Sequence, residues 1–166
     1  MGKHLKITLL ILSICCGSSV QAKISIQPSY EKELLAEEIY QKIISEHFFK
    51  NQVSEDHNLL LGKILIEQLD SQKIYFTKNE VSRLTKKFES SSSNIEIIAS
   101  YEVINLYFNR LIEATNYQIQ EIKKNNFNFD LDAQISIDDD SREAHRNSFQ
   151  LRKTWRKLAK NDVLTS

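Results

Sequence analysis

The chain has 166 residues, and its 22 Lys and Arg residues balance its 22 Asp and Glu residues, so net charge does not favour nucleic acid as a partner. After residue 22 it contains one glycine (Gly62), one proline and no cysteine, which excludes thiol chemistry and cysteine metal sites from that region. Phosphate-binding loops and nucleophile elbows are disfavoured there too, because they need glycines that adopt positive φ and let a ligand approach the backbone.

Residues 1–22 have the layout of a secretory signal peptide: a short basic start, an apolar run over residues 7–16, and small or modest side chains before the expected cleavage between Ala22 and Lys23. The run is shorter than the ~20 apolar residues that span a bilayer, so we expect no stable membrane span after cleavage. The alternative is a buried N-terminal helix or strand. An exported chain that loses both cysteines with its signal is compatible with a bacterial periplasm, where we expect this protein.

Residues 23–166 are enough for one domain with its own core, and they read as a series of helices. Apolar residues at intervals of three and four predict a first helix over residues 29–49, with Leu35 and Ile39 on its apolar face. A second helix is expected to begin at the N-cap Ser54. Its apolar stripe consists of Leu60, Leu61, Ile64, Leu65 and Leu69.

A capping box is expected between Thr77 and Glu80, because the Thr77 hydroxyl can accept from the Glu80 amide while the Glu80 side chain reaches back. The helix that follows has Leu84 and Phe88 on one side. Serines at 90–93 predict a loop after it, because serine competes with the helical backbone for hydrogen bonds.

The longest helix is expected over residues 95–124, a length of about 45 Å. Its apolar positions are Ile97, Ile98, Tyr101, Ile104, Phe108, Leu111, Ile119 and Ile122. Alternating apolar residues predict an extended segment within residues 125–140, with a plain loop as the alternative. A capping box at Asp140 would start the last helix, over residues 141–160, with Trp155 on its apolar face. The sequence therefore predicts an all-α bundle of about five helices, with one long helix and an extended segment before the last one.

No residue pattern identifies a chemical site. His47, His57 and His145 are too widely spaced for a local metal motif, and the acidic residues within 130–140 lack the glycine and terminal glutamate of an EF-hand. The basic residues around Trp155 are read as a solvated helix face with an aromatic anchor; the alternative is contact with nucleic acid or anionic lipid. No serine sits in a glycine-bearing turn that would form an oxyanion hole. We therefore expect no catalytic residue, no cofactor and no metal.

Three motifs resemble bacterial tail-specific proteases, the periplasmic C-terminal processing peptidases. Residues 69–81 are similar to their LD…YF…(D/E) signature, residues 127–130 to their F-x-F-(D/T) segment, and residues 151–164 to their L…WR…LKND-L helix. One departure lies at residues 140–145, where the family tends to carry DR…PW. The residues that carry the resemblance, expected to be structural, are Leu69, Asp70, Tyr75, Phe76, Phe127, Phe129, Trp155, Arg156, Lys160, Asn161 and Asp162.

The resemblance covers residues 30–164 and implies the helical N-terminal domain that precedes a PDZ domain and a serine–lysine protease domain in that family. The chain ends where the PDZ domain is expected to begin. We therefore expect a non-catalytic module, truncated or split from the catalytic part, that contributes to substrate enclosure or adaptor docking. Its expected partners are proteins: the PDZ and protease domains, an adaptor or protein substrates. The alternative is a stand-alone periplasmic interaction or adaptor protein.

Overall fold

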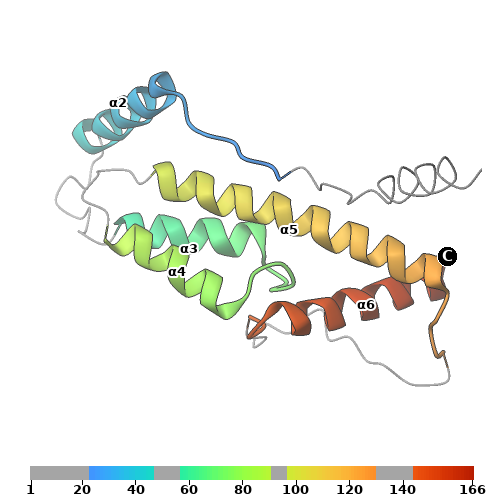
Figure 1. Cartoon of the computed structure of the whole chain (residues 1–166). Helices are drawn as coiled ribbons and strands as arrows, with labels where there is room; N and C mark the ends of the chain where they lie inside the picture. The colour runs from blue at the N-terminus through green and yellow to red at the C-terminus, as the bar shows by residue number, and fades with distance from the viewer. Residues whose placement is uncertain (1–22, 47–56, 91–96, 130–143) are drawn as a thin grey trace, which may run out of the picture.

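A computed structural model describes residues 23–46, 57–90, 97–129 and 144–166 (Figure 1). Within these ranges the chain forms five α-helices and no strand, so the predicted all-α class is confirmed. The helices are α2 (Tyr30–Glu46), α3 (His57–Leu69), α4 (Lys78–Glu89), α5 (Ile97–Lys124) and α6 (Ser148–Thr165). No helix in the described part of the chain is both long enough and apolar enough to cross a bilayer.

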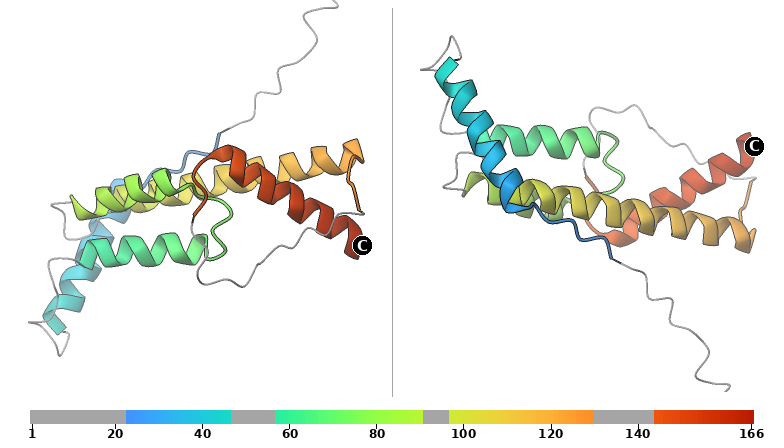
Figure 2. Two further views of the ribbon diagram at one scale, coloured as in Figure 1. Left: turned by 90° about the horizontal axis from the view of Figure 1, so that it is seen from below. Right: turned by 90° about the horizontal axis from the view of Figure 1, so that it is seen from above.

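The long helix α5 organises the bundle. Its 28 residues span about 42 Å, close to the predicted length. Helices α3 and α4 pack along its N-terminal half, whereas α6 packs along its C-terminal half (Figures 1 and 2). Two clusters of buried apolar side chains therefore follow one another along the same helix.

Helix α4 forms as the sequence predicts. The Thr77 hydroxyl accepts from the Glu80 amide at 3.3 Å, and the Glu80 carboxylate accepts from the Thr77 amide at 2.9 Å, which completes the capping box. Leu84 and Phe88, four residues apart, are both buried in the first cluster. The capping residues fix where this helix starts, and the intervals between its apolar residues fix which face turns inward.

Helix α3 turns a different face to the core from the one predicted. Leu65 and Leu69 contact the first cluster, but the other members of the predicted stripe, Leu60, Leu61 and Ile64, are exposed. The buried side of α3 carries Asn58, Gly62 and Ile66 instead. Gly62 decides this orientation, because the ring of Phe88 occupies the space where a side chain would project. The predicted helix start at Ser54 lies outside the described residues.

The predicted apolar face of α5 is also wrong in part. The residues of α5 that are buried are Ala99, Val103, Ala114 and Glu121. Among the predicted apolar positions, those that are exposed are Ile98, Phe108, Ile119 and Ile122. Ala99 and Ala114 are small, and small side chains let neighbouring helices approach closely. The number of large apolar residues therefore does not by itself determine the inward face.

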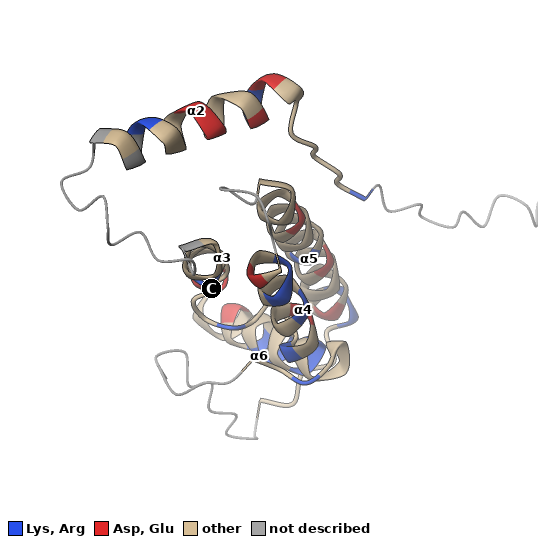
Figure 3. Cartoon of the chain, turned by 90° about the vertical axis from the view of Figure 1, so that its left-hand side faces the viewer, with Lys and Arg blue, Asp and Glu red and all other residues tan. Residues whose placement is uncertain are grey.

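Helix α2 stands apart from the other helices (Figures 1 and 3). It spans Tyr30–Glu46, within the predicted range of 29–49, whose last residues lie outside the described part. The apolar side chains of Leu35 and Ile39 are about half exposed, at 54% and 50%. The periodicity therefore predicts the helix correctly, although its apolar face does not enter either cluster.

Helix α6 starts later than predicted, at Ser148 instead of residue 141. The side chain of Asn147 caps it by accepting from the Gln150 amide at 3.1 Å. The preceding backbone is not helical because the His145 carbonyl accepts from the amide of Lys78 at 2.8 Å, outside α6. The predicted capping box at Asp140 lies outside the described residues. So does most of the predicted extended segment, of which residues 125–129 form a turn and irregular backbone.

Replacing Gly62 with alanine should destabilise the domain, although alanine favours a helix over glycine by about 0.8–1.0 kcal/mol. An added Cβ would lie 2.4 Å from the ring of Phe88, and overpacking of this kind costs about 1–3 kcal/mol. We expect the free energy of unfolding, measured by urea denaturation, to fall by up to about 2 kcal/mol. Combining Gly62→Ala with Phe88→Leu should cost less than the sum of the two single changes. Stabilisation by Gly62→Ala alone would contradict this packing.

Candidate functional site

The carboxylate of Asp70 organises the loop between α3 and α4. It is buried, and it accepts hydrogen bonds from three consecutive amides: Ile74 at 2.8 Å, Tyr75 at 3.1 Å and Phe76 at 2.7 Å. Burial raises the pKa of the Asp70 carboxyl above its ordinary value, and the three amide hydrogen bonds oppose that rise. A single side chain thus satisfies the backbone donors of a tight loop.

Trp155 fastens this loop to α6. Its ring is fully buried, with 0% exposure, and its Nε1–H donates to the carbonyl oxygen of Ile74 at 2.7 Å. Phe76 is also fully buried, while Tyr75 and Leu69 are partly buried against the first cluster. The first and third family motifs, more than seventy residues apart in sequence, therefore meet in one structure. We call residues 70–77 together with Trp155 the junction.

His145 takes part in the same packing. Its backbone forms an isolated β-bridge with Thr77, and its Nε2 lies 3.0 Å from the Thr154 hydroxyl.

Among residues 23–46, 57–90, 97–129 and 144–166, no group of His, Cys, Asp and Glu side chains is arranged to hold a metal ion. His47, the side chain of His57 and the acidic residues of 130–140 lie outside what the structure describes.

A chain of ion pairs links α4, α5 and α6. Arg110 on α5 lies 2.5 Å from the carboxylates of both Glu80 and Glu113, and Arg152 on α6 lies 3.0 Å from Glu113. Burial by itself raises the pKa of the Glu113 carboxyl, but hydrogen bonds from Arg152 and Arg110 together bring it below its ordinary value. These groups hold three helices in register beside the junction.

The second family motif lies against α6. Phe127 and Phe129 have ring centroids 6.0 Å apart. The Arg156 guanidinium lies 5.9 Å from the Phe127 ring and Lys160 lies 5.8 Å from the Phe129 ring, within reach of cation–π attraction. Arg156 also pairs with Glu121 at 3.2 Å. These contacts attach the segment that follows α5 to the outer surface of α6.

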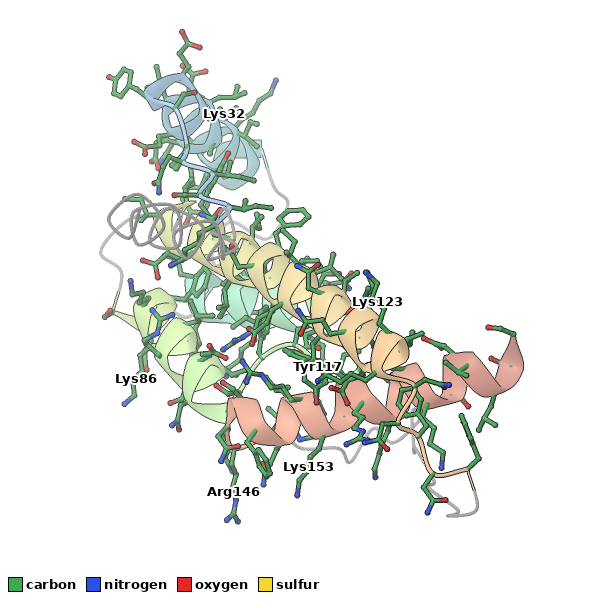
Figure 4. All side chains as sticks on the ribbon, turned by 45° about the vertical axis from the view of Figure 1, so that its right-hand side comes forward. Lys32, Lys86, Tyr117, Lys123, Arg146 and Lys153 are labelled. Atoms are coloured by element: carbon green, nitrogen blue, oxygen red, sulfur yellow. The ribbon has the colours of Figure 1, made fainter. Side chains whose placement is uncertain are left out.

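The basic residues of α6 form a solvated face around a buried aromatic anchor, as the sequence predicts. The exposed ones are Arg152, Lys153, Arg156 and Lys157. Lys153 points outward, whereas Tyr117 of α5 lies between α5 and α6 (Figure 4). Asn161 and Asp162 are exposed near the end of α6; Ala22 lies outside the described residues, and Lys23, the first of them, is exposed.

Two residues that the sequence analysis did not single out make the longest-range polar contacts of the chain's N-terminal segment. Asn105 and Asn109 on α5 bind the backbone of Ile26 and Ile24. Their signal in the sequence is a pair of asparagines four residues apart inside a long helix, where asparagine is a poor helix former.

Among the motif residues, the Asp70 carboxylate is bonded to backbone amides and the Trp155 indole to a carbonyl, whereas Phe129, Arg156, Asn161 and Asp162 are exposed. The family model for the tail specific protease N-terminal domain matches residues 39–166, a range that contains all of these motif residues. No curated protein and no solved structure matches the chain. On the strength of that family match, the chain belongs to the family of tail-specific protease N-terminal domains.

Proposed function

We propose that this domain is a non-catalytic docking module of a tail-specific protease, which helps to enclose the substrate or to dock an adaptor. The observation that carries the proposal is the exposed apolar side of α3. Leu60, Leu61 and Ile64 are 59%, 48% and 47% exposed. Neighbouring large apolar side chains on a surface mark a site of contact with another macromolecule.

The use of the motif residues supports a role without catalysis. Asp70, Phe76 and Trp155 are buried and bonded within the domain, so they act on its own folding. With Gly62 the sole glycine after residue 22, the chain also has little means of building a glycine-bearing oxyanion turn. Cutting of peptide bonds is then the work of the serine–lysine protease domain of the family.

The proposed place of action is the periplasm, on the basis of the basic, apolar and small residues that succeed one another in residues 1–22. The proposed partners are the PDZ and protease domains, joined to this domain or supplied as a second polypeptide, an adaptor, or protein substrates. All of them would meet the apolar side of α3 in water, where burial of about 25 cal/mol per Å² favours association.

The test is capture of the PDZ and serine–lysine protease domains from the same organism by the purified chain from Lys23 onward, measured by interferometry. Leu61→Ser combined with Ile64→Ser should abolish capture without unfolding the domain, because both side chains are exposed. Lys63→Ser, an exposed change on the same helix, should leave capture intact. Capture that survives the double change would refute docking through α3.

The same samples test the catalytic part of the proposal. The purified chain alone should not cleave an unfolded protein with an apolar C-terminus, whereas the protease domains should. Sustained cleavage by the chain alone, unaffected by further purification, would contradict a non-catalytic role.

A further inference from the structure

The N-terminal segment, residues 23–29, runs along α5 in an extended conformation before α2 begins (Figures 1 and 2). We call it the strand, although it forms no β-bridge. Two asparagine side chains hold its backbone. The Asn109 Oδ1 accepts from the Ile24 amide at 2.9 Å while its Nδ2 donates to the Ile24 carbonyl at 2.8 Å. Asn105 makes the same pair of bonds with Ile26, both at 2.7 Å. Each side-chain amide thus pairs with both polar groups of one backbone residue.

The spacing of the two asparagines matches the repeat of an extended chain. Residues four apart on a helix rise by about 6 Å, and alternate residues of a strand by about 6.6–6.8 Å. Asn105 and Asn109 therefore meet every second residue of the strand, which runs opposite to α5. In this register the next pair would be Tyr101 with Pro28, and neither offers the required amide. The pattern therefore consists of two amide–backbone pairs, Asn109 with Ile24 and Asn105 with Ile26. We call this pattern the ladder and each pair a rung.

The bonds of this ladder do not depend on the sequence of the strand, because they go to main-chain N–H and C=O groups that nearly every residue carries. Asn109 also donates to the carbonyl of Asn105 at 2.7 Å, which fixes the orientation of its amide. Beside the strand lies a cavity of about 340 Å³ lined by residues that include Arg83, Glu102 and Leu106. Lys23, Ile24 and Ser25 of the strand line the same cavity.

The strand and its site belong to different parts of the chain. Asn105 and Asn109 lie inside the range matched by the family, residues 39–166, whereas the strand precedes that range. Ile26 is 42% exposed, and α2, which follows, stands apart from the other helices. None of the residues of the strand belongs to either buried cluster.

We propose that Asn105 and Asn109 form a binding site for the backbone of an extended polypeptide, and that residues 24–26 occupy this site as an exchangeable latch. The partner is an unfolded segment of another protein that presents free N–H and C=O groups on two residues separated by one. The inference deepens the proposed function, on which it rests, by naming where a substrate chain would lie.

The first test measures binding of a fluorescent peptide, Lys-Ile-Ser-Ile-Gln, to the purified chain from Lys23 onward by fluorescence anisotropy. Ile24→Pro combined with Ile26→Pro removes both donors of the latch and frees the site. If the latch occupies the site nine-tenths of the time, this change should tighten peptide binding about tenfold. Ser25→Pro, a matched change between the two rungs, should leave the affinity near that of the unmodified chain.

A peptide N-methylated on both isoleucines is the control for the chemistry of binding. It keeps the side chains but lacks the two donors, so it should not bind. A peptide of scrambled sequence with intact amides should bind within a few fold of the original. Equal binding of the methylated peptide, or no binding by the freed site, would overturn the proposal.

Substitution of the asparagines completes the test. Asn105→Asp combined with Asn109→Asp keeps the shape but removes both side-chain donors, so peptide binding should be lost; Asn116→Asp on the same helix should have no effect. If this double change abolishes peptide binding but leaves capture of the protease domains intact, the ladder and the docking surface are separate. If the unmodified chain binds the peptide but does not capture the protease domains, only the docking role is refuted.

Discussion

Trp155→Ala should lower the free energy of unfolding by about 3–5 kcal/mol, the range measured when large buried aromatic side chains are truncated. The indole is fully buried, and it packs against Ala114 and Leu151 in the second cluster. Its ring centroid lies 6.1 Å from that of Tyr117. Truncation leaves a cavity between α5 and α6 and also removes the hydrogen bond that holds the loop at Ile74. Chemical denaturation followed by circular dichroism measures the loss.

Two further substitutions separate packing from hydrogen bonding. Trp155→Phe keeps a ring but leaves the Ile74 carbonyl without its indole donor, which should cost about 1–3 kcal/mol. Phe149→Ala removes an exposed aromatic residue from the same helix and should change stability by less than about 0.5 kcal/mol. If Trp155→Ala cost no more than this control, the second cluster would not stabilise the domain.

Asp70→Asn should cost about 2–4 kcal/mol at neutral pH, because hydrogen bonds to charged groups contribute about 1.5–3 kcal/mol each. The substitution replaces one carboxylate oxygen by an NH₂ group. That group would face the amide of either Ile74 or Phe76, a donor against a donor. Relief from burying a charge offsets part of the loss. Asp162→Asn, an exposed change on α6, should leave the unfolding midpoint nearly unchanged.

The pH dependence gives Asp70 a distinct signature. Because burial raises its pKa in the folded state above the ordinary 3.8, its contribution to stability is full below that value and declines as pH rises through the folded pKa. The difference in unfolding free energy between the original chain and Asp70→Asn should therefore be larger near pH 3.8 than at neutral pH. A difference that shrinks on acidification would mean that the folded-state pKa is lowered.

The local signals of the sequence predict most of the helices and few of their faces. The Thr77 capping box fixes α4 because its donors and acceptors are three residues apart and need no tertiary partner. The inward faces of α3 and α5 depend instead on shape, since Gly62 admits the Phe88 ring and Ala99 lets a neighbour approach. A count of large apolar residues does not reveal a position such as Gly62, where the lack of a side chain makes room for a neighbouring ring.

The same limit applies to the candidate site. The motif residues Asp70 and Trp155 are identifiable from their sequence context, but what they bind is backbone, the amides of a loop and one carbonyl. Nearly every residue carries the same backbone N–H and C=O groups, so the residue types in a sequence do not show which of these groups will bind a side chain. Asn105 and Asn109 escaped notice for this reason, since they too bind main-chain groups.

Tyr75 touches both buried clusters, which follow one another along α5. Unfolding around either cluster would remove part of the packing of the Tyr75 ring and so weaken the other cluster. Heat should consequently melt helices α3 to α6 in one transition, with no stage in which one end is folded and the other unfolded.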